Sequence, residues 1–199
     1  FDGKIYRFRG QCSYVLAQDK LTGSFSIHIK NDGECDGTGT CKRSLTIFMN
    51  DASVDIKLDE DGQPTVYTAS GEAVPLPTMI YDLSIQRISD YIVVREAING
   101  WYLKWDGAES VFLRMDEGMM GQTSGLCGVF DRDQSNDFET RSGTLVKTVS
   151  LFANSWKIDQ NCLDATEEGY CSIKDEVSAR KATEAIMRCS YLLDTECKD

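Results

Sequence analysis

The sequence predicts a mainly β fold: an antiparallel β-sandwich-like domain followed by a small, disulfide-rich helical C-terminal appendage. From residue 4 to residue 115, short runs of alternating apolar and polar residues, rich in Val, Ile, Phe and Tyr, are separated by Asp-Gly and Asn-Gly pairs, which is typical of hairpins. After residue 162, apolar residues recur at helical intervals. Eight cysteines in 199 residues indicate a disulfide framework.

The alternating runs define the expected strands. Phe25, Ile27 and Ile29 alternate with polar residues, so one face of this strand is apolar. Six further runs are expected to be strands: 44–48, 53–58, 79–85, 91–97, 101–105 and 110–115. Four turn pairs lie between such runs: Asp32-Gly33, Asp61-Gly62, Asn99-Gly100 and Asp106-Gly107. These residue types accept the positive φ of tight hairpins, so the spacing favours an antiparallel sandwich or barrel-like sheet over a parallel α/β fold.

Aromatic residues are expected to fill most of the core, because their rings bury the largest apolar areas. The expected set lies at strand or motif positions: Tyr6, Phe8, Tyr14, Phe25, Trp105, Phe112, Phe130, Phe138, Phe152 and Trp156. Met119 and Met120 precede Gly121 in a predicted loop, and flexible apolar side chains there are candidates for an exposed contact patch.

The residues after Cys162 form the predicted appendage. Four apolar residues there are spaced by four, three and four positions: Ala182, Ile186, Cys189 and Leu193. Three cysteines lie in the same segment: Cys171, Cys189 and Cys197. The sequence therefore predicts a β domain at 1–162 and a helical, disulfide-stapled region at 163–199.

Charge and cysteine content limit the class of partner. The chain has 32 acidic and 21 basic residues, a formal net charge of −11 and no basic cluster, which disfavours nucleic acid and anionic membrane surfaces. No run approaches the roughly 18 apolar residues of a membrane span. Eight cysteines indicate an oxidising compartment, and hence a secreted, extracellular protein. Zinc is disfavoured because no C-x₂-C pair occurs and His28 is the only histidine.

No arrangement of residues indicates catalysis. His28 falls on the polar face of its strand, where we expect an ordinary surface residue, whereas a Ser-His-Asp or Cys-His unit needs its histidine beside a nucleophile. The glycine-rich run at 33–40 lacks the ending of a phosphate loop. Pairs of carboxylates are expected by chance in so acidic a chain. We therefore expect that the protein is not an enzyme.

An acidic loop follows the cysteine of a GLCG run. Asp131, Asp133, Asn136 and Asp137 lie within seven residues, and such oxygens repel one another unless water screens them or a cation such as Ca²⁺ binds them. An EF-hand is disfavoured because the glycine and the closing glutamate of that motif are missing. The residues alone leave two interpretations open, a calcium site and an ordinary acidic turn.

Several motifs occur in a fixed order along the chain. FDGKIYRFRGQCSYVLAQD opens the sequence, WDG stands near its centre, GLCG precedes an acidic loop that ends in NDF, and LFANSW precedes Cys162. In these motifs the chain resembles a von Willebrand factor type D domain over residues 1–162. Residues 163–199 resemble the opening of the eight-cysteine domain that usually follows, and with three cysteines we expect a partial or degenerate copy.

The resemblance implies a calcium ion as cofactor. Type D domains bind calcium through the aspartate of the FDG opening and through oxygens of the acidic loop. In this sequence the implied ligands are the following: Asp2, Asp131, Asp133, Asn136 and Asp137. Val129 occupies the position of an asparagine common in the family and offers no side-chain oxygen, for which Asp133 is expected to compensate.

The resemblance also implies disulfide pairs. Cys12 would pair with Cys162 and Cys35 with Cys41, and loop-closure entropy assigns about 5 kcal/mol to the long closure and about 2.4 kcal/mol to the short one. Cys127 pairs in the family with a cysteine upstream of the FDG opening. The partners of four cysteines are left open: Cys127, Cys171, Cys189 and Cys197.

The resemblance finally implies a function. Ser124 replaces the first cysteine of the CGLC motif of many relatives, so the local dithiol needed for thiol exchange is missing. We expect a calcium-binding, disulfide-stabilised module of a larger secreted glycoprotein or matrix protein, acting in assembly, adhesion or protein binding. Its partners would be other extracellular modules, of the same chain or of a second copy. The alternatives are a module of a lipid-transport or yolk lipoprotein, which an upstream lipid-binding region would indicate, and a growth-factor-binding regulator, which flanking cysteine-rich repeats would indicate.

Overall fold

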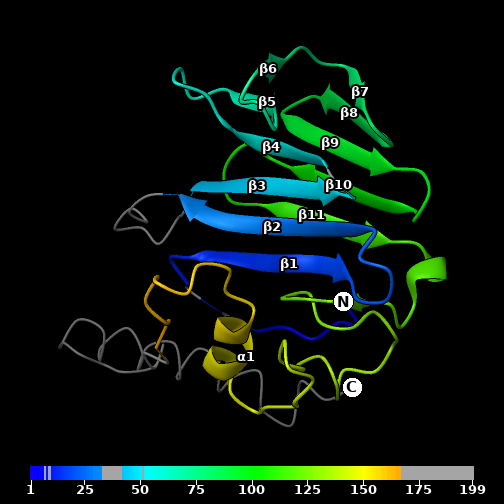
Figure 1. The fold of residues 1–199 in the computed structure, drawn as a ribbon, viewed down its shortest axis with the longest axis vertical. Helices are drawn as coiled ribbons and strands as arrows, with labels where there is room; N and C mark the ends of the chain where they lie inside the picture. Colours follow the sequence, from blue (N-terminus) through cyan, green and yellow to red (C-terminus); the bar gives the residue numbers. More distant parts are fainter. Residues whose placement is uncertain (7, 9, 33–41, 51, 167–199) are drawn as a thin grey trace, which may run out of the picture. The chain divides into compact units, whose positions relative to one another are not determined.

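Two antiparallel sheets form the framework of the described chain (Figure 1). The computed structural model describes residues 1–6, 8, 10–32, 42–50 and 52–166. The strands of the seven-stranded sheet are β1 (Ser13–Asp19), β2 (Phe25–Asp32), β3 (Lys42–Met49), β4 (Ala52–Leu58), β5 (Pro64–Thr68), β6 (Ala73–Val74) and β12 (Thr123–Ser124). The strands of the five-stranded sheet are β7 (Thr78–Ile80), β8 (Leu83–Ile88), β9 (Tyr91–Glu96), β10 (Trp101–Trp105) and β11 (Val111–Met115). The mainly β, antiparallel fold is therefore confirmed.

Hairpins connect most neighbouring strands. In space the strands follow the orders β12-β1-β2-β3-β4-β5-β6 and β11-β10-β9-β8-β7. Three of the predicted turn pairs separate β4 from β5, β9 from β10 and β10 from β11, whereas Gly33 of the fourth lies outside the described residues. The single strand expected at 79–85 is wrong. Tyr81 has a φ of 52°, and the chain turns back there so that Ile80 pairs with Leu83.

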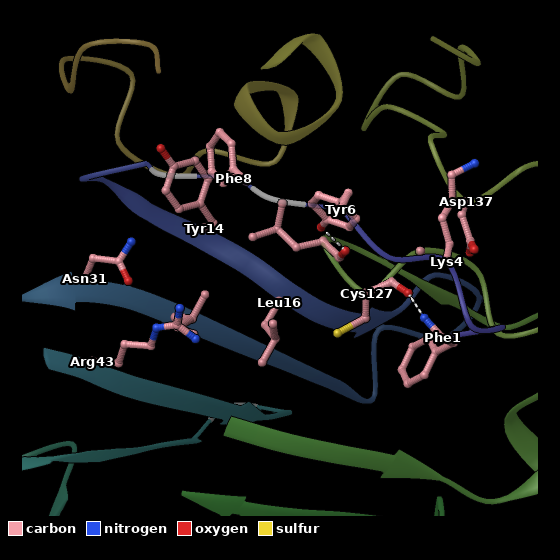
Figure 2. A pocket seen from close by; sticks show the side chains of 13 residues that line it. Phe1, Lys4, Tyr6, Phe8, Tyr14, Leu16, Asn31, Arg43, Cys127 and Asp137 are labelled. Carbon is pink, nitrogen blue, oxygen red and sulfur yellow. Dashed lines mark hydrogen bonds between the residues drawn. The ribbon is translucent and has the colours of Figure 1, made fainter. Parts of the chain in front are cut away.

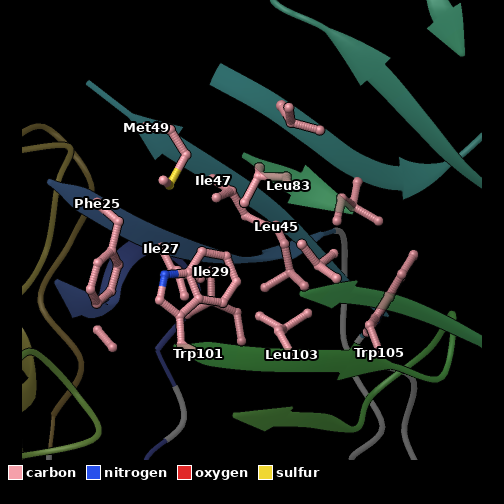
Figure 3. Packing of buried hydrophobic residues seen from close by; sticks show 14 of the residues in the cluster. Phe25, Ile27, Ile29, Leu45, Ile47, Met49, Leu83, Trp101, Leu103 and Trp105 are labelled. Atoms are coloured by element: carbon pink, nitrogen blue, oxygen red, sulfur yellow. The ribbon is translucent and has the colours of Figure 1, made fainter. Parts of the chain in front are cut away.

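The core lies between the inner faces of the two sheets. β10 contributes Trp101, Leu103 and Trp105, none of them more than 1% exposed. They pack in one cluster with residues such as Ile27 and Ile47 of the seven-stranded sheet (Figure 3). Because successive side chains of a strand point to opposite faces, the alternating pattern sends every second residue into this core. Burying one such side chain contributes about 1.5–3 kcal/mol.

One short helix packs beside β1 (Figure 1). α1 (Val149–Ser155) buries Phe152 against Val15 of β1, and Trp156 completes this second apolar cluster. The Trp156 indole N–H donates a hydrogen bond to the Glu139 carbonyl at 3.2 Å. A helix of seven residues is too short to show a helical period in the sequence, so the sequence analysis missed it.

Most of the expected core aromatics are buried or half-buried, but the assignment is wrong for Phe112. Phe112 is 47% exposed because it alternates with Val111 and Leu113, which pack against the core. Trp101 was not in the expected set and is among the largest fully buried side chains. The exposed methionine patch is also wrong in part, because Met119 is buried in the main core.

His28 lies on the outer face of β2, as the alternation predicts, but its ring is half-buried rather than freely exposed. The ring packs on Phe48 with 4.6 Å between centroids and shares a hydrogen bond of 2.9 Å with the Ser26 hydroxyl. Burial, together with the Arg141 cation, lowers the pKa of His28 to about 4. The ring is therefore neutral at physiological pH.

The predicted disulfide between Cys12 and Cys162 is present. Its Cα atoms are 5.9 Å apart although the residues are 150 positions apart in sequence, and this distance is normal for a disulfide. Contacts set Phe1–Ala165 apart as one unit. The expected Cys35–Cys41 pair and the helix and cysteines expected after residue 166 lie outside the described residues. Within the part that is described, no helix has the length and apolar character needed to cross a membrane.

Candidate functional site

The opening residues of the chain lie along the loop that follows β12. The amino group of Phe1 donates a hydrogen bond to the Cys127 carbonyl, and the Tyr6 hydroxyl donates one to the Leu126 carbonyl. The Phe1 ring also packs against Phe130, with 5.5 Å between centroids. These contacts bring the FDG opening next to the acidic loop, although more than 120 residues separate them in sequence.

The FDG aspartate is part of this contact. Asp2 Oδ2 accepts a hydrogen bond from the Asp131 amide at 3.0 Å, and the Asp2 carbonyl accepts one from Gln134 Nε2 at 2.6 Å. Lys4 Nζ donates to the Gln134 carbonyl at 2.8 Å. Burial raises the pKa of Asp2, but the amides of Asp131 and Arg132 outweigh this effect and lower it below the ordinary value. The Asp2 carboxylate is therefore held in its charged form.

The start of the loop is fixed on the edge of β1. The amide of Leu126 donates to the Val15 carbonyl at 3.0 Å, and the amide of Cys127 donates to the Leu16 carbonyl at 2.9 Å. Gly125 has a φ of 132°, and a Cβ atom there would lie 2.7 Å from the Leu16 carbonyl oxygen. Only glycine allows this close approach without displacement.

Two aspartates shape the loop itself. Asp131 Oδ1 accepts a hydrogen bond from the Asp133 amide at 2.9 Å, and Asp131 Oδ2 accepts one from Asn136 Nδ2 at 2.6 Å. Asp133 Oδ1 accepts one from the Ser135 amide at 2.9 Å. Hydrogen bonds from the Ser135 side chain and amide lower the pKa of Asp133, which is an exposed residue. Asp133 therefore stabilises a turn on the solvent-exposed side of the loop.

Asp137 is in the opposite situation. It is only 3% exposed, and neither of its carboxylate oxygens has a hydrogen-bond partner of normal geometry among the described residues. The side-chain oxygen of Asn136 is also buried without a partner. Burial raises the pKa of Asp137, and the neighbouring Asp2 carboxylate adds to this, whereas the amino group of Phe1, Lys4 and the backbone amide of Val129 act to lower it. A buried carboxylate without hydrogen bonds is costly, so this position is where a cation would be most favourable.

The Asp137 carboxylate lies against the backbone of the GLCG run. A Cβ atom on Gly128 would lie 2.1 Å from Asp137 Oδ1, and Gly128 has a φ of 76°. The sequence analysis did not assign a role to Gly128 or to Lys4, although GLCG and FDGK contain them. Within the described residues, no group of three His, Cys, Asp or Glu side chains could hold a metal ion. A cation here would therefore also need amide or backbone oxygens.

A cavity of about 370 Å³ borders the same residues. Phe1, Lys4 and Asp137 lie at one end of it, and Asn31 and Arg43 lie at the other (Figure 2). At the Asn31 end, the side-chain amide of Asn31 donates a hydrogen bond to the Gly10 carbonyl, whereas Arg43 Nε is buried without a partner among the described residues. The cavity therefore has polar groups at both ends and rings along its length.

A comparison with models of protein families shows which family the chain belongs to. The family model of the von Willebrand factor type D domain matches residues 1–144, which include the FDG opening and the acidic loop. The chain belongs to this family. The resemblance read from the sequence motifs is thereby confirmed, and the sandwich with its acidic loop is the described part of a type D domain.

Known relatives of this type D domain are long proteins. Mucin-2 of Mus musculus is 37% identical over 171 residues, which cover 83% of this chain and 4% of the relative. SCO-spondin of Gallus gallus is 32% identical to this chain, and the match covers 4% of that relative. Otogelin-like protein of Homo sapiens is 31% identical, and the match covers 8% of it. The chain thus spans less than a tenth of each of these relatives. Because these relatives are secreted proteins, we conclude that this chain is secreted and extracellular.

The cysteine of the GLCG run has no disulfide among the described residues of the type D domain. Burial raises the pKa of the Cys127 thiol to about 11, so the thiol is protonated at neutral pH. Ser124, at the place of the first cysteine of CGLC, is buried and accepts a hydrogen bond from Gln18 Nε2 at 3.3 Å. The structure thus places a hydroxyl, paired to β1, where thiol exchange would need a second sulfur.

Proposed function

We propose that this type D domain is a calcium-stabilised, non-catalytic module through which a large secreted protein assembles with other extracellular modules. One observation carries the calcium part: Asp137 is buried, and in the described part of the chain neither of its carboxylate oxygens has a hydrogen-bond partner. The Asp2 carboxylate is near enough to raise the pKa of Asp137, and Asn136, the preceding residue, has a buried side-chain oxygen without a partner among the described residues.

The free energy of burying a charge supports this proposal. A carboxylate that leaves water without a partner costs several kcal/mol, and the Asp2 carboxylate adds repulsion. Calcium prefers carboxylate, amide and carbonyl oxygens. In this proposal Asp137 binds the ion directly, Asn136 and Asp2 supply further oxygens, and Asp131 and Asp133 hold the loop and contribute negative charge. Val129 is buried, so only its backbone is available.

The consequence for assembly is geometric. An ion bound between Asp2 and Asp137 would clamp the opening of the chain to the acidic loop, which is itself bonded to β1 through Leu126 and Cys127. The Cys12–Cys162 disulfide holds the other end of the same unit. A surface fixed in this way loses little conformational entropy when a second module docks. Its role is therefore to present a rigid surface rather than to carry out chemistry.

Substitution of Asp137 tests the calcium site. Unfolding by urea should show that calcium at about 100 times its dissociation constant stabilises the wild type by about 2.7 kcal/mol. Asp137→Asn should lose this increment. In EDTA, Asp137→Asn should be at least as stable as the wild type, because the unpaired buried charge is gone.

Asp133→Asn is the matched control, because Asp133 is an exposed aspartate of the same loop. It should keep most of the calcium increment. Isothermal titration should give heat of calcium binding for the wild type and for Asp133→Asn. Absence of calcium binding by the wild type, or an equal loss in both variants, would refute the site.

The assembly part needs the full-length parent protein. Asp137→Asn in that protein should reduce the fraction that is secreted as covalent or non-covalent multimers, measured by non-reducing electrophoresis and light scattering of the secreted material. Asp133→Asn should leave the distribution unchanged. A normal multimer distribution in the Asp137→Asn protein would separate calcium binding from assembly and refute this part of the proposal.

A further inference from the structure

The outer face of the five-stranded sheet differs in composition from the rest of the chain. In the cross-strand register, Tyr102 of β10 lies between Arg95 of β9 and Arg114 of β11, and Lys104 of β10 pairs with Phe112 of β11. These residues alternate with those of the core and therefore point away from it. The outward positions of β8 to β11 are the following: Ser84, Gln86, Ile88, Tyr91, Val93, Arg95, Tyr102, Lys104, Phe112 and Arg114.

This face carries three positive charges and no carboxylate at its strand positions, in a chain whose formal net charge is −11. Arg95 and Arg114 are exposed, and Lys104 is half-buried. In the described part of the chain, none of these three forms a salt bridge; the recorded pairs, Arg132 with Glu117 and Lys157 with Asp164, lie on other segments. The charges of this face are therefore available to a partner.

Aromatic rings hold two of the three cations in place. Lys104 Nζ lies 5.0 Å from the centroid of the Tyr91 ring and 4.6 Å from that of Phe112, and the Arg95 guanidinium lies 5.2 Å from the centroid of Tyr102. Cation–π contacts of this kind leave the N–H donors free while they restrict the side chains. A partner would then meet charges that are already ordered, which lowers the entropy cost of binding.

We infer that this face, formed by Arg95, Lys104 and Arg114 with Tyr91, Tyr102 and Phe112, binds an acidic polysaccharide. Arginine fits the planar carboxylate and the sulfate group with paired hydrogen bonds. Phe112 is exposed and Tyr91 and Tyr102 are half-buried, so the accessible ring faces can stack on the apolar faces of sugar rings. An acidic peptide would use only the cations. The inference is independent of the calcium site, which involves other residues.

Binding of the protein to immobilised heparin tests the inference. Heparin and dextran sulfate should bind, uncharged dextran should not, and the affinity should fall as salt screens the charges. Replacement of one exposed charge contact changes an affinity by about fivefold. Lys104→Glu should therefore weaken heparin binding about fivefold or more. The combination of Arg95→Glu, Lys104→Glu and Arg114→Glu should reduce it beyond detection.

The seven-stranded sheet offers a matched control. Lys57 also lies over an aromatic ring, 4.9 Å from the centroid of Tyr67, but its hairpin pairs Tyr67 with the acidic residue Asp55. Lys57→Glu changes the same charge on a strand and should leave heparin binding within about twofold of the wild type. Circular dichroism of each variant verifies that it is folded.

Phe112→Ala separates sugar recognition from charge alone, because it removes a ring and no charge. It should weaken heparin binding about threefold and polyglutamate binding by less, because both ligands lose the ordering of Lys104 by the ring but only a sugar loses a stacking surface. The inference is refuted if the wild type does not bind heparin, if Lys57→Glu and Lys104→Glu have equal effects, or if polyglutamate binds as tightly as heparin.

Discussion

Asp19 and Asp137 are both almost completely buried, but their surroundings are opposite. The Asp19 carboxylate, at the end of β1, accepts hydrogen bonds from the amides of Leu21, Thr22 and Ser24 and from the hydroxyls of Thr22 and Ser24. Asp137 accepts none. Burial raises the pKa of Asp19, but these bonds outweigh it and lower the pKa to about 2, whereas the pKa of Asp137 is raised.

The comparison shows that buried carboxylates are stabilised differently in the sheets and in the acidic loop. The hairpins of the sheets satisfy their own carboxylates with backbone amides, as Glu96 also does with the amides of Ile98 and Asn99. The loop buries the Asp137 carboxylate, whose oxygens accept no hydrogen bond of normal geometry from the described residues and which only nearby positive charges and the Val129 amide offset. We therefore expect the sandwich to be stable through its own packing and disulfide, and the loop edge to depend on what binds there. Four predictions test this difference.

The largest effect is expected at the disulfide. Replacement of Cys12 and Cys162 together by serine should lower the free energy of unfolding by about 5 kcal/mol, because the bond closes a loop of 150 residues in the unfolded chain. Urea denaturation measures the change. Cys127→Ala is the control and should cost about 1 kcal/mol, since this cysteine is half-buried and has no disulfide among the described residues. Equal losses would contradict the prediction.

The second test compares two aromatic residues on neighbouring strands. Trp101→Ala should cost about 3–5 kcal/mol, because Trp101 fills the core between the sheets and is 1% exposed. Phe112→Ala should cost less than about 1 kcal/mol, because half of Phe112 is in solvent. The measurement is the midpoint of urea unfolding at constant m-value. A large loss for Phe112→Ala would place that ring in a core and undermine the assignment of the outer face.

The third test addresses the contact between the GLCG run and Asp137. Gly128→Ala should cost about 2–3 kcal/mol and abolish the response to calcium, since its Cβ atom would meet the Asp137 carboxylate at 2.1 Å. Gly71→Ala is the matched control, because Gly71 has a similar φ of 82° and no neighbour within 4 Å. It should cost about 1 kcal/mol and keep the calcium response. Thermal unfolding with and without calcium distinguishes the two variants.

The smallest effect is the pH dependence at Asp19. Its folded-state pKa, about 2, lies below the ordinary value, so its stabilising contribution is complete above about pH 4 and is lost as pH falls towards 2. Asp19→Asn should therefore be about 2 kcal/mol less stable than the wild type at pH 7, and the difference should shrink below pH 4. Unfolding measured from pH 7 to pH 2 tests this. A constant difference across that range would show that the charge of Asp19 is unimportant.

The strands were the most predictable part of the fold. β3, β4, β9, β10 and β11 each lie within two residues of an expected run, because a half-buried strand imposes a period of two on its sequence. The run at 79–85 failed since its turn contains no glycine or asparagine, only Tyr81 at positive φ followed by Asp82. Turn residues therefore predicted the hairpins that contain an Asp-Gly or Asn-Gly pair. They did not predict the turn in which Tyr81 adopts a positive φ.

Of the candidate site, the sequence could predict the residues but not their roles. It indicated that Asp2 and the acidic loop belong together only through the order of the family motifs. Nothing in the spacing distinguishes Asp133, which is exposed, from Asp137, which is buried. That difference depends on the path of the loop over Gly128 and on the opening segment that covers it.

By itself, the sequence determined the class of this protein: a secreted, antiparallel β domain with a long disulfide, a type D motif order and an acidic loop. The β class follows from local pattern, because hydrophobic period and turn residues act over a few positions, whereas the pairing of the long disulfide was implied only by the resemblance to the family. Only the tertiary structure decided which charges are satisfied. It left Asp137 without a partner, gave Asp19 five hydrogen bonds and gathered Arg95, Lys104 and Arg114 on one face. Such juxtapositions arise from strand order and register, which join residues far apart in the chain.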